Sequence, residues 1–392
     1  MKKIVGLLVS ILCFWSCSTS PKDTLFEELS ASHTGVDFTN HILDRPDFNI
    51  FNYRNFYNGG GVALGDLNND GLPDLFLTSN FEQNRLYLNK GNLQFEDITE
   101  KVGISGKKFW STGVTMADVN GDGLLDIYVC NSGNKDNRGN QLYINQGIKA
   151  GMPSFKEQAQ EYGLTNGGFT THAAFFDYDR DGDLDMYCLN NSFTPMDRLG
   201  YANLRAKRDA LGGDKLYRND NNHFVDVSEQ VGIYGSLIGF GLGVTIGDVN
   251  NDNWPDIYVS NDFYERDYLY INQRNGTFKE SIEEQIGHTP LSSMGSDIAD
   301  LNNDGWQDII VTEMFPESEE RVKRTATYES YDFFQFKLKQ DYYYQYMRNM
   351  VHIKDIPDVM KKAVLAIEDD RFYEHGGVDY LGITRAALHM PV

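Results

Sequence analysis

Positive charge is scarce in this sequence. The 35 Lys and Arg residues are outnumbered by 57 Asp and Glu residues, which gives a formal net charge of −22 and an isoelectric point of about 4.7. An acidic surface repels phosphate backbones, so we expect no nucleic-acid partner and expect cations to bind instead. Long apolar runs are also missing. After the N-terminus, none reaches the roughly 20 residues that a membrane-spanning helix needs.

Cysteine is rare as well, with four in 392 residues. Cys13 and Cys17 lie near the start, and Cys130 and Cys188 lie in strand-like runs further along. A disulfide between Cys130 and Cys188 is one interpretation, if the chain reaches an oxidising compartment. Two buried free thiols are the other interpretation, because unpaired cysteine behaves as a small apolar side chain.

Long helical patterns are few, whereas aromatic residues make up 13% of the chain and glycine occurs 37 times. This composition favours an all-β protein. The length allows one large domain or two to three ordinary ones.

The N-terminus reads "MKKIVGLLVSILCFWSCSTS", with two lysines before an apolar run from Ile4 to Trp15. This pattern predicts a signal peptide over residues 1–16. Ser16-Cys17 resembles the end of a bacterial lipobox, in which Cys17 is acylated and residues 17–24 form a lipidated tether. We therefore expect an exported protein, anchored by lipid to the outer membrane or cell surface. Ordinary secretion with cleavage nearby is the alternative.

The middle of the chain repeats an acidic loop of nine residues, as in "DLNNDGLPD" from Asp66. Variants begin at Asp118, Asp177, Asp248 and Asp300, at irregular spacing. Such spacing is typical of a repeat array with loop insertions. Each loop lies between two strand-like runs that are rich in β-branched and aromatic residues.

Four of the five units continue with a second strand-like motif, Leu-Tyr-any-Asn, and a lone Phe in a third strand. A polar stretch then ends in a glycine that we expect to be left-handed and to close a helical turn. These residues are Leu86, Leu142, Leu216 and Leu269, then Phe95, Phe155, Phe224 and Phe278, and finally Gly103, Gly163, Gly232 and Gly287. Four short strands per unit predict a β-propeller blade, so we expect an all-β propeller, complete or incomplete, of five loop repeats.

The loops resemble the front half of an EF-hand, but an EF-hand needs a Glu at loop position 12 and flanking helices. Position 12 is apolar in every loop, so the last predicted ligand is the Asp at position 9. Positions 1, 3, 5 and 9 give the predicted metal ligands Asp66, Asn68, Asp70, Asp74, Asp118, Asn120, Asp122, Asp126, Asp177, Asp179, Asp181, Asp185, Asp248, Asn250, Asp252, Asp256, Asp300, Asn302, Asp304 and Asp308.

Hard oxygen ligands without Cys or His select Ca²⁺ over transition metals, and Mg²⁺ prefers a rigid, largely hydrated octahedron. Position 6 is Gly in four loops and Asn253 in one, and both tolerate positive φ. The alternative is that these stretches are only Asx-type hairpin turns. Because Asp recurs at positions 1, 5 and 9 in all five copies, the sequence predicts calcium as the cofactor.

These loops, with their flanking strands and Leu-Tyr motifs, resemble the FG-GAP/VCBS repeats of bacterial surface proteins and the calcium hairpins of the integrin α-subunit propeller. The lead-in "FNYRNFYNGGGVALGDLNNDGLPD" is similar to VCBS-repeat lipoproteins of Bacteroidetes, often grouped with ASPIC/UnbV proteins. The resemblance covers residues 25–350. It implies a cell-surface propeller that binds an unidentified protein or glycan.

Residues 351–392 differ in character and include an amphipathic helical pattern. "EDDRFYEHGGVDYLGITRAAL" resembles the first motif of glycosyltransferase family 51, the peptidoglycan polymerase domain of class A penicillin-binding proteins. The resemblance implies that Glu368 is the general base. A full domain of that family is several times longer, so we expect a truncated, inactive fragment. A peptidoglycan glycosyltransferase fused to a propeller is the alternative function.

Two further features allow a functional and a structural interpretation. His172 replaces a glycine found at the matching position of the other units, and it could line a central channel or serve as a structural residue. The stretch "YDFFQFKLKQDYYYQY" from Tyr331 could stack on sugars or form incomplete blade strands. A purely adhesive module without a small-molecule ligand is a third candidate function.

Overall fold

The computed structural model describes residues 26–104, 110–133, 138–314, 320–321, 331–347 and 349–351. The chain divides into two compact units, and the unit Ser30–Ile356 holds all the helices and strands given below. The predicted signal peptide and lipidated tether lie outside the described residues. The same holds for the C-terminal segment with its predicted helix, apart from residue 351.

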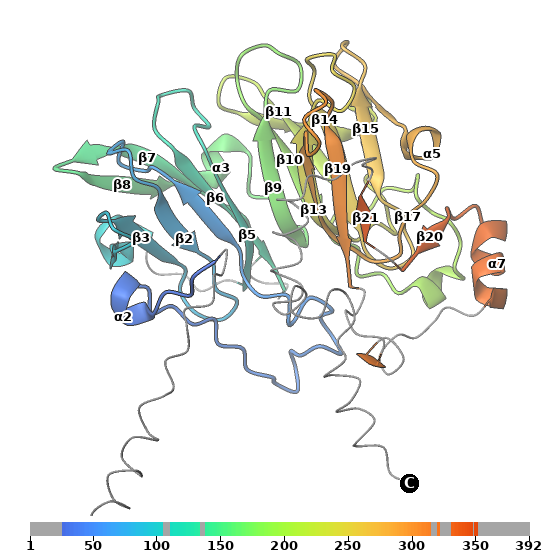
Figure 1. Cartoon of the computed structure of the whole chain (residues 1–392), viewed down its shortest axis with the longest axis horizontal. Helices are drawn as coiled ribbons and strands as arrows, with labels where there is room; N and C mark the ends of the chain where they lie inside the picture. Colours follow the sequence, from blue (N-terminus) through green and yellow to red (C-terminus); the bar gives the residue numbers. More distant parts are fainter. Residues whose placement is uncertain are drawn as a thin grey trace, which may run out of the picture. The chain divides into compact units, whose positions relative to one another are not determined.

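Four antiparallel sheets of four strands each form most of this unit (Figure 1). In each sheet the strands are neighbours in chain order. The first two sheets consist of β1 (Val62–Gly65), β2 (Asp74–Leu77), β3 (Arg85–Asn89) and β4 (Phe95–Asp97), and of β5 (Trp110–Ala117), β6 (Asp126–Ser132), β7 (Gln141–Lys149) and β8 (Met152–Glu157). The third and fourth consist of β9 (Thr170–Phe176), β10 (Asp185–Asn190), β11 (Lys215–Asn219) and β12 (Phe224–Asp226), and of β13 (Gly241–Gly247), β14 (Asp256–Asn261), β15 (Tyr268–Asn272) and β16 (Phe278–Glu280).

A fifth sheet has three described strands, β18 (Ser293–Ala299), β19 (Asp308–Glu313) and β21 (Met350–Val351). The sequence shows no Leu-Tyr motif after the fifth loop, yet β21 takes the place of the motif strand. Val311 pairs with Met350, as Leu77 pairs with Arg85 in the first sheet. Beside them, β17 (Thr289–Pro290) pairs in parallel with β20 (Gln345–Tyr346).

The Asn349 side chain confirms this equivalence. Its Oδ1 accepts a hydrogen bond from the backbone N–H of Glu313 at 2.8 Å. In the first sheet, Asn84 Oδ1 accepts one from the N–H of Ser79 at the same distance. The third strand of the fifth sheet is therefore supplied from much further along the chain than in the other sheets.

The described helices are short, namely α2 (Ala31–Thr34), η1 (Thr99–Lys101), α3 (Ala159–Tyr162), η2 (Met196–Leu199), α4 (Ser228–Val231), α5 (Ile282–Gln285) and α7 (Tyr331–Lys339). Helical turns follow the fourth strands, and Gly103, Gly163 and Gly232 are left-handed as expected, with φ of 90°, 78° and 88°. The expectation for Gly287 is wrong, because α5 ends at Gln285, the next residue Ile286 is extended, and Gly287 is not left-handed. The strand interpretation of the aromatic stretch is also wrong for 331–339, which form α7.

None of the helices in the described ranges is long and apolar enough to cross a membrane.

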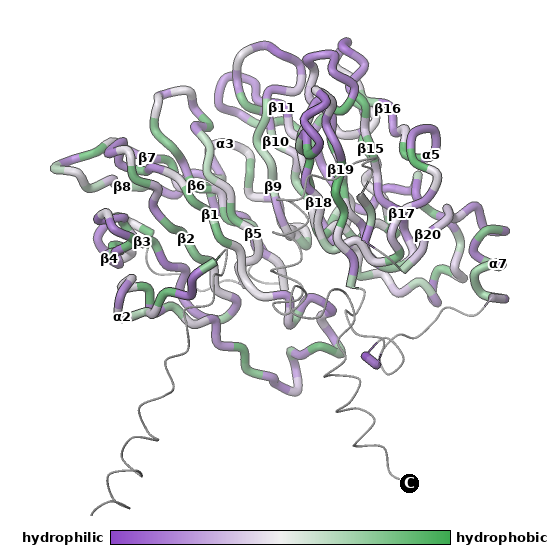
Figure 2. Tube along the Cα trace, in the orientation of Figure 1, coloured by the Kyte–Doolittle hydropathy of each residue, from purple (hydrophilic) through white to green (hydrophobic). Residues whose placement is uncertain are grey.

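The hydrophobic core lies between consecutive sheets, and Figure 2 shows apolar residues along the strands with hydrophilic loops between them. Leu86 and Ile98 of the first repeat pack with Tyr143 and Phe155 of the second repeat. Leu216 of the third sheet packs in the same cluster as Tyr270 and Phe278 of the fourth. The motif leucine thus faces the following sheet, and the motif tyrosine and the lone Phe face the preceding one. Full burial of such a side chain contributes roughly 1.5–3 kcal/mol.

The first strands of the sheets lie side by side, because β1 contacts β5, β5 contacts β9, β9 contacts β13, and β13 contacts β18. Glycine is required where they meet. A Cβ on Gly61 would lie 2.7 Å from the Thr112 carbonyl oxygen, and one on Gly113 would lie 2.4 Å from that of Thr171. His172 packs against Gly113 at this junction, and burial lowers its pKa. The fold is mostly β, with a propeller-like arrangement of four complete blades.

Cys130 and Cys188 are both free thiols and fully buried. They lie in the apolar cluster between the second and third sheets. The disulfide interpretation is therefore wrong, and the two thiols serve as small apolar side chains.

Candidate metal sites

All five acidic loops fold in the same way around the aspartate at position 1. In the first loop, Asp66 Oδ1 accepts a hydrogen bond from the N–H of Asp70 at 3.0 Å, and Oδ2 accepts one from the N–H of Gly71 at 2.7 Å. The same pair of bonds recurs at 2.7–3.1 Å in the other loops, on Asp118, Asp177, Asp248 and Asp300. The first carboxylate therefore organises the turn.

Two left-handed residues per loop make this turn possible. Position 6 has positive φ in all five loops, from 65° at Asn253 to 101° at Gly182, which confirms the sequence-based expectation. Position 4 is also left-handed in every loop, which the sequence analysis missed. These position-4 residues are Asn69, Gly121, Arg180, Asn251 and Asn303. Asn is a signal for this conformation because it tolerates positive φ better than most residues do.

The position-5 aspartates also stabilise the loop, because their side chains accept hydrogen bonds from the backbone N–H at position 7. Asp70 Oδ1 accepts a hydrogen bond from the N–H of Leu72 at 2.9 Å, and Asp252 Oδ1 accepts one from the N–H of Trp254 at 2.8 Å. The equivalent bond occurs on Asp122, Asp181 and Asp304. Where position 3 is Asn, its Oδ1 accepts from the position-5 N–H, on Asn68, Asn120, Asn250 and Asn302.

The position-9 aspartates join the loop to the sheet. Asp74 is fully buried, and its Oδ2 accepts a hydrogen bond from the N–H of Leu67 while its Oδ1 accepts one from the N–H of Asn89. Asp126, Asp185 and Asp256 make the same pair, the second bond coming from Asn145, Asn219 and Asn272. Asp308 makes the first bond, with Leu301.

The asparagines that end the Leu-Tyr motif are positioning residues that the sequence analysis treated only as part of a strand. Besides the backbone bond, the amide of Asn89 donates to the carbonyl oxygen of Pro73 at 2.8 Å. The available signal was their recurrence at one motif position in four units.

Burial raises the pKa of three position-9 carboxyls, to about 6 for Asp126 and Asp256 and to about 7 for Asp185. Their backbone donors oppose this shift. Burial raises the pKa of Asp74 in the same direction. A bound cation would favour the ionised form of such carboxyls, because an opposite charge stabilises it.

The third loop brings carboxylates closest together. Among the described residues, one group of at least three His, Cys, Asp or Glu side chains has ligand atoms within 4.8 Å of one another, and it consists of Asp177, Asp179 and Asp185. Asp179 Oδ1 is buried and has no hydrogen-bond partner within the described ranges. Asp181, also a predicted ligand, is outside this group. An all-oxygen donor set with an unpaired acceptor fits a hard cation such as Ca²⁺.

Asp183, at position 7 of the same loop, was not among the predicted ligands. Its Oδ1 is buried without a partner among the described residues, and burial and the neighbouring carboxylates raise its pKa to about 6. The third loop thus carries a side-chain carboxylate where the other loops carry Leu or Trp.

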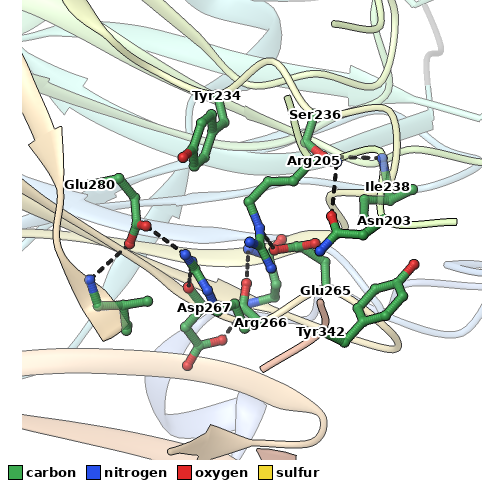
Figure 3. A network of polar contacts seen from close by, with 12 residues as sticks. Asn203, Arg205, Tyr234, Ser236, Ile238, Glu265, Arg266, Asp267, Glu280 and Tyr342 are labelled. Atoms are coloured by element: carbon green, nitrogen blue, oxygen red, sulfur yellow. Dashed lines mark hydrogen bonds and ion pairs between the residues drawn. The ribbon is translucent and has the colours of Figure 1, made fainter. Parts of the chain in front are cut away.

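A separate cluster of charged side chains lies at the end of the fourth sheet that is opposite its acidic loop. Figure 3 shows this cluster. Arg205 Nε lies 2.5 Å from Glu265 Oε1, and Arg266 Nη2 lies 2.6 Å from Glu280 Oε2. Glu265 and Arg266 occupy the turn between β14 and β15, whereas Arg205 belongs to the insertion before β11. Gln345 Nε2 donates to the Glu265 carbonyl oxygen at 3.2 Å. The cluster fixes the insertion and β20 on the fourth sheet.

Two predicted site residues, Cys17 and Glu368, lie outside the described residues. The acidic loops are therefore the predicted site that the structure describes.

Comparison with known protein families gives two matches. The FG-GAP-like repeat family matches residues 66–129 and 248–311, and the Transglycosylase family matches residues 337–391. The FG-GAP-like match covers four of the acidic loops, those that begin at Asp66, Asp118, Asp248 and Asp300, with the strands beside them. The second begins in α7 and includes β20 and β21.

Curated relatives agree with both matches. Cartilage acidic protein 1 of Xenopus tropicalis is 30% identical over 141 residues, 36% of this chain and 21% of that protein. Integrin alpha-3 of Mus musculus is 34% identical over 93 residues, 21% of this chain and 8% of the integrin. Penicillin-binding protein 1A of Neisseria gonorrhoeae is 48% identical over 46 residues, 12% of this chain and 6% of that protein. The chain thus spans about a fifth or less of the length of these relatives.

Among solved structures, an N-acetylglucosamine-recognising lectin of Agrocybe aegerita has a TM-score of 0.35 and 18% identity, covering 64% of this chain and 59% of the lectin. This likeness is too distant to indicate a function. The chain carries FG-GAP-like repeats, followed by a short stretch that is similar to transglycosylases.

Proposed function

We propose that this chain is a calcium-stabilised propeller module that binds a protein or glycan partner at the cell surface. The observation that carries the proposal is the convergence of Asp177, Asp179 and Asp185 on one point in the third loop. The same backbone turn recurs in the other four loops, so each is a further candidate site. The similarity to FG-GAP-like repeats, including integrin alpha-3, supports an interaction role rather than catalysis.

The ion's contribution follows from charge. Each loop gathers carboxylates that repel one another, and the position-9 carboxyl is buried in four of the five loops and partly buried at Asp308. Calcium would neutralise them through Asp oxygens at positions 1, 3, 5 and 9, with Asn at position 3 in four loops. A ligand that binds only the folded chain adds about 2.7 kcal/mol per site at a hundredfold excess over Kd. The folded state then depends on the cation.

Calorimetry and thermal unfolding test this proposal. We expect the melting temperature to rise with calcium and to fall with chelator. Asp179→Ala removes a carboxylate of the third loop and should lower the number of bound ions by one. Asp197→Ala, at an exposed position outside the loops, is the matched control. Equal melting temperatures with calcium and with chelator would show that the loops are turns without ions.

Surface attachment is the second part of the proposal. It rests on the short apolar run before Cys17 and on the absence of a longer apolar run in the sequence. The partner can be sought with a glycan array and with cell-surface proteins of the organism that produces this chain. A protein that is recovered only from the soluble extracellular fraction would contradict a lipid anchor.

A peptidoglycan glycosyltransferase role is the second candidate, favoured by the Transglycosylase match and the relationship to penicillin-binding protein 1A. Glu368 would then be the general base, a role that a carboxylate performs when it lies within hydrogen-bonding reach of the acceptor hydroxyl. Incubation with lipid-linked disaccharide tests it. Glycan polymer from the wild type that disappears in Glu368→Gln would favour this enzyme over a pure interaction module.

A further inference from the structure

Consecutive sheets are joined by a recurring set of contacts. A threonine hydroxyl donates to a carbonyl oxygen of the next first strand, as Thr78 does to Thr112 at 2.6 Å and Thr245 does to Ser296 at 2.8 Å. Thr112 and Thr171 do the same at the other two junctions. Loops are also linked, because the position-4 Asn251 amide donates to the position-6 carbonyl oxygen of Gly305 in the next sheet at 2.8 Å.

On the fifth sheet the equivalent groups, Thr312 and Asn303, contact no further first strand among the described residues; the Thr312 hydroxyl donates within its own sheet, to the Gly295 carbonyl oxygen at 3.2 Å. Among the described residues, a Cβ on Gly295 would have Thr312 Oγ1, at 3.9 Å and in its own sheet, as its one neighbour within 4 Å. Thr312, which occupies the place of Thr78, is exposed. The exposed position-4 Asn303 amide has no hydrogen-bond partner among the described residues, and Trp306 is 55% exposed.

The first sheet presents the complementary face. Val62 and Leu64 on β1 are 62% and 64% exposed. Their equivalents in the second sheet, Val114 and Met116, are covered by the first sheet in the shared apolar cluster. β1 thus carries an apolar face like those with which β5 packs on the first sheet and β13 packs on the third.

We propose that the fifth sheet of one molecule binds the first sheet of a second copy of this chain, head to tail. The occupant follows from continuity with an interface that already recurs four times within the chain, because the described residues include both halves of one further copy of it and no described segment covers either half. In the second copy, Val62 and Leu64 would pack on the fifth sheet. The Thr312 hydroxyl would donate to the carbonyl oxygen of Gly60 in the second copy, which is the counterpart of Thr112. The Asn303 amide would donate to the carbonyl oxygen of Gly71 in the second copy.

Such contacts are heterologous, because two different faces of the same molecule meet. Association therefore extends beyond a dimer, either into a ring or into an open chain of copies, whereas a self-complementary face would stop at two. The proposal depends on the sheet packing and not on the partner or the enzymatic role considered above.

Sedimentation of the full chain in the presence of calcium, over a range of protein concentrations, tests the proposal. The wild type should gain mass with concentration, beyond two copies. Gly295→Val should fold normally, since the nearest described atom outside the adjoining residues lies 3.9 Å from its Cβ, and should block the fifth sheet. The double variant Val62→Lys and Leu64→Lys should block the first sheet. Leu93→Lys, at a 55% exposed site in the turn between β3 and β4, should associate like the wild type.

Mixing the two blocked variants gives a sharper result. Each is expected to be monomeric alone, and an equimolar mixture should form a one-to-one dimer and nothing larger, because one free face remains on each partner. Circular dichroism checks folding, and Gly295→Ala replaces Gly295→Val if the larger side chain disturbs it. A wild type that stays monomeric at its highest soluble concentration overturns the proposal. So does association that survives both blocking variants.

Discussion

The side-chain amide of Asn272 in β15 donates a hydrogen bond to the carbonyl oxygen of Tyr178, 2.8 Å away in the acidic loop of the third sheet. Asn145 makes the equivalent bond to Leu67 at 3.1 Å, from the second sheet to the first loop. The same asparagines donate their backbone N–H to the position-9 aspartates. One motif residue therefore closes a loop of its own sheet and binds the loop of the sheet before it.

Asn272→Leu should destabilise the protein by about 1–3 kcal/mol, because the buried carbonyl oxygen of Tyr178 loses its donor. Chemical denaturation with calcium present measures the change in the free energy of unfolding. Gln273→Ala, at the exposed neighbouring position, is the control and should stay within about 0.5 kcal/mol of the wild type. Equal stability of Asn272→Leu and the control would show that this bond is energetically neutral.

Glu265→Ala should cost about 3–5 kcal/mol, because it leaves the largely buried guanidinium of Arg205 without its closest carboxylate. Combining Glu265→Leu with Arg205→Met should cost less, since no charge is then left unpaired. Glu284→Ala breaks the exposed pair with Lys279 and should cost at most about 1 kcal/mol. Urea unfolding of the four proteins compares them. A double variant that is less stable than Glu265→Ala would contradict the desolvation account.

Asp267→Asn should flatten the pH dependence of stability. Burial raises the pKa of Asp267 to about 7, although Asn261, Tyr258 and Ser293 donate hydrogen bonds to it. Its pKa in the folded state lies above its unfolded value of 3.8. Between pH 3.8 and about 7 the folded chain therefore binds more protons than the unfolded chain does. Stability then falls as pH rises from about 4 to 7, by up to about 1.4 kcal/mol per pH unit, and levels off above 7.

The asparagine variant lacks this titration but keeps the shape of the site, since Asn140 occupies the equivalent place in the second sheet and donates to Tyr128. Unfolding free energies of both proteins at pH 5 and pH 8, with calcium throughout, measure the effect. We expect the variant to gain stability relative to the wild type on going from pH 5 to pH 8. Parallel pH profiles would exclude Asp267 as a titrating group in this range.

Cys17→Ala should abolish labelling by a fatty-acid analogue in cells, because the thiol is the predicted attachment point after the apolar run ends. Cys13→Ala removes a thiol within that run and should leave labelling unchanged. Labelling followed by membrane fractionation reads out both variants. Equal labelling of Cys17→Ala and the wild type would leave Cys17 without the proposed role.

The sequence alone determined the acidic loops and the order of strands around them. The turn within a loop such as Asp66–Asp74 is held by hydrogen bonds between residues at most seven positions apart, so a short stretch of sequence is enough to specify it. The alternating apolar residues of the strands are similarly local, because side chains on a strand point to opposite faces in turn. The positive φ at position 6 follows from Gly and Asn in the same way.

Only the tertiary structure determined which residues far apart in the sequence contact one another. Asn349 reaches Glu313 across 36 residues, Arg205 reaches Glu265 across 60, and Asn272 reaches Tyr178 across 94. No local pattern names such partners, because hydrogen-bonding and charged groups can pair with many others until packing places one of them alongside. The same packing leaves Val62 and Leu64 exposed while burying Val114, although both strands carry the same apolar alternation, because burial depends on whether a neighbouring sheet is present.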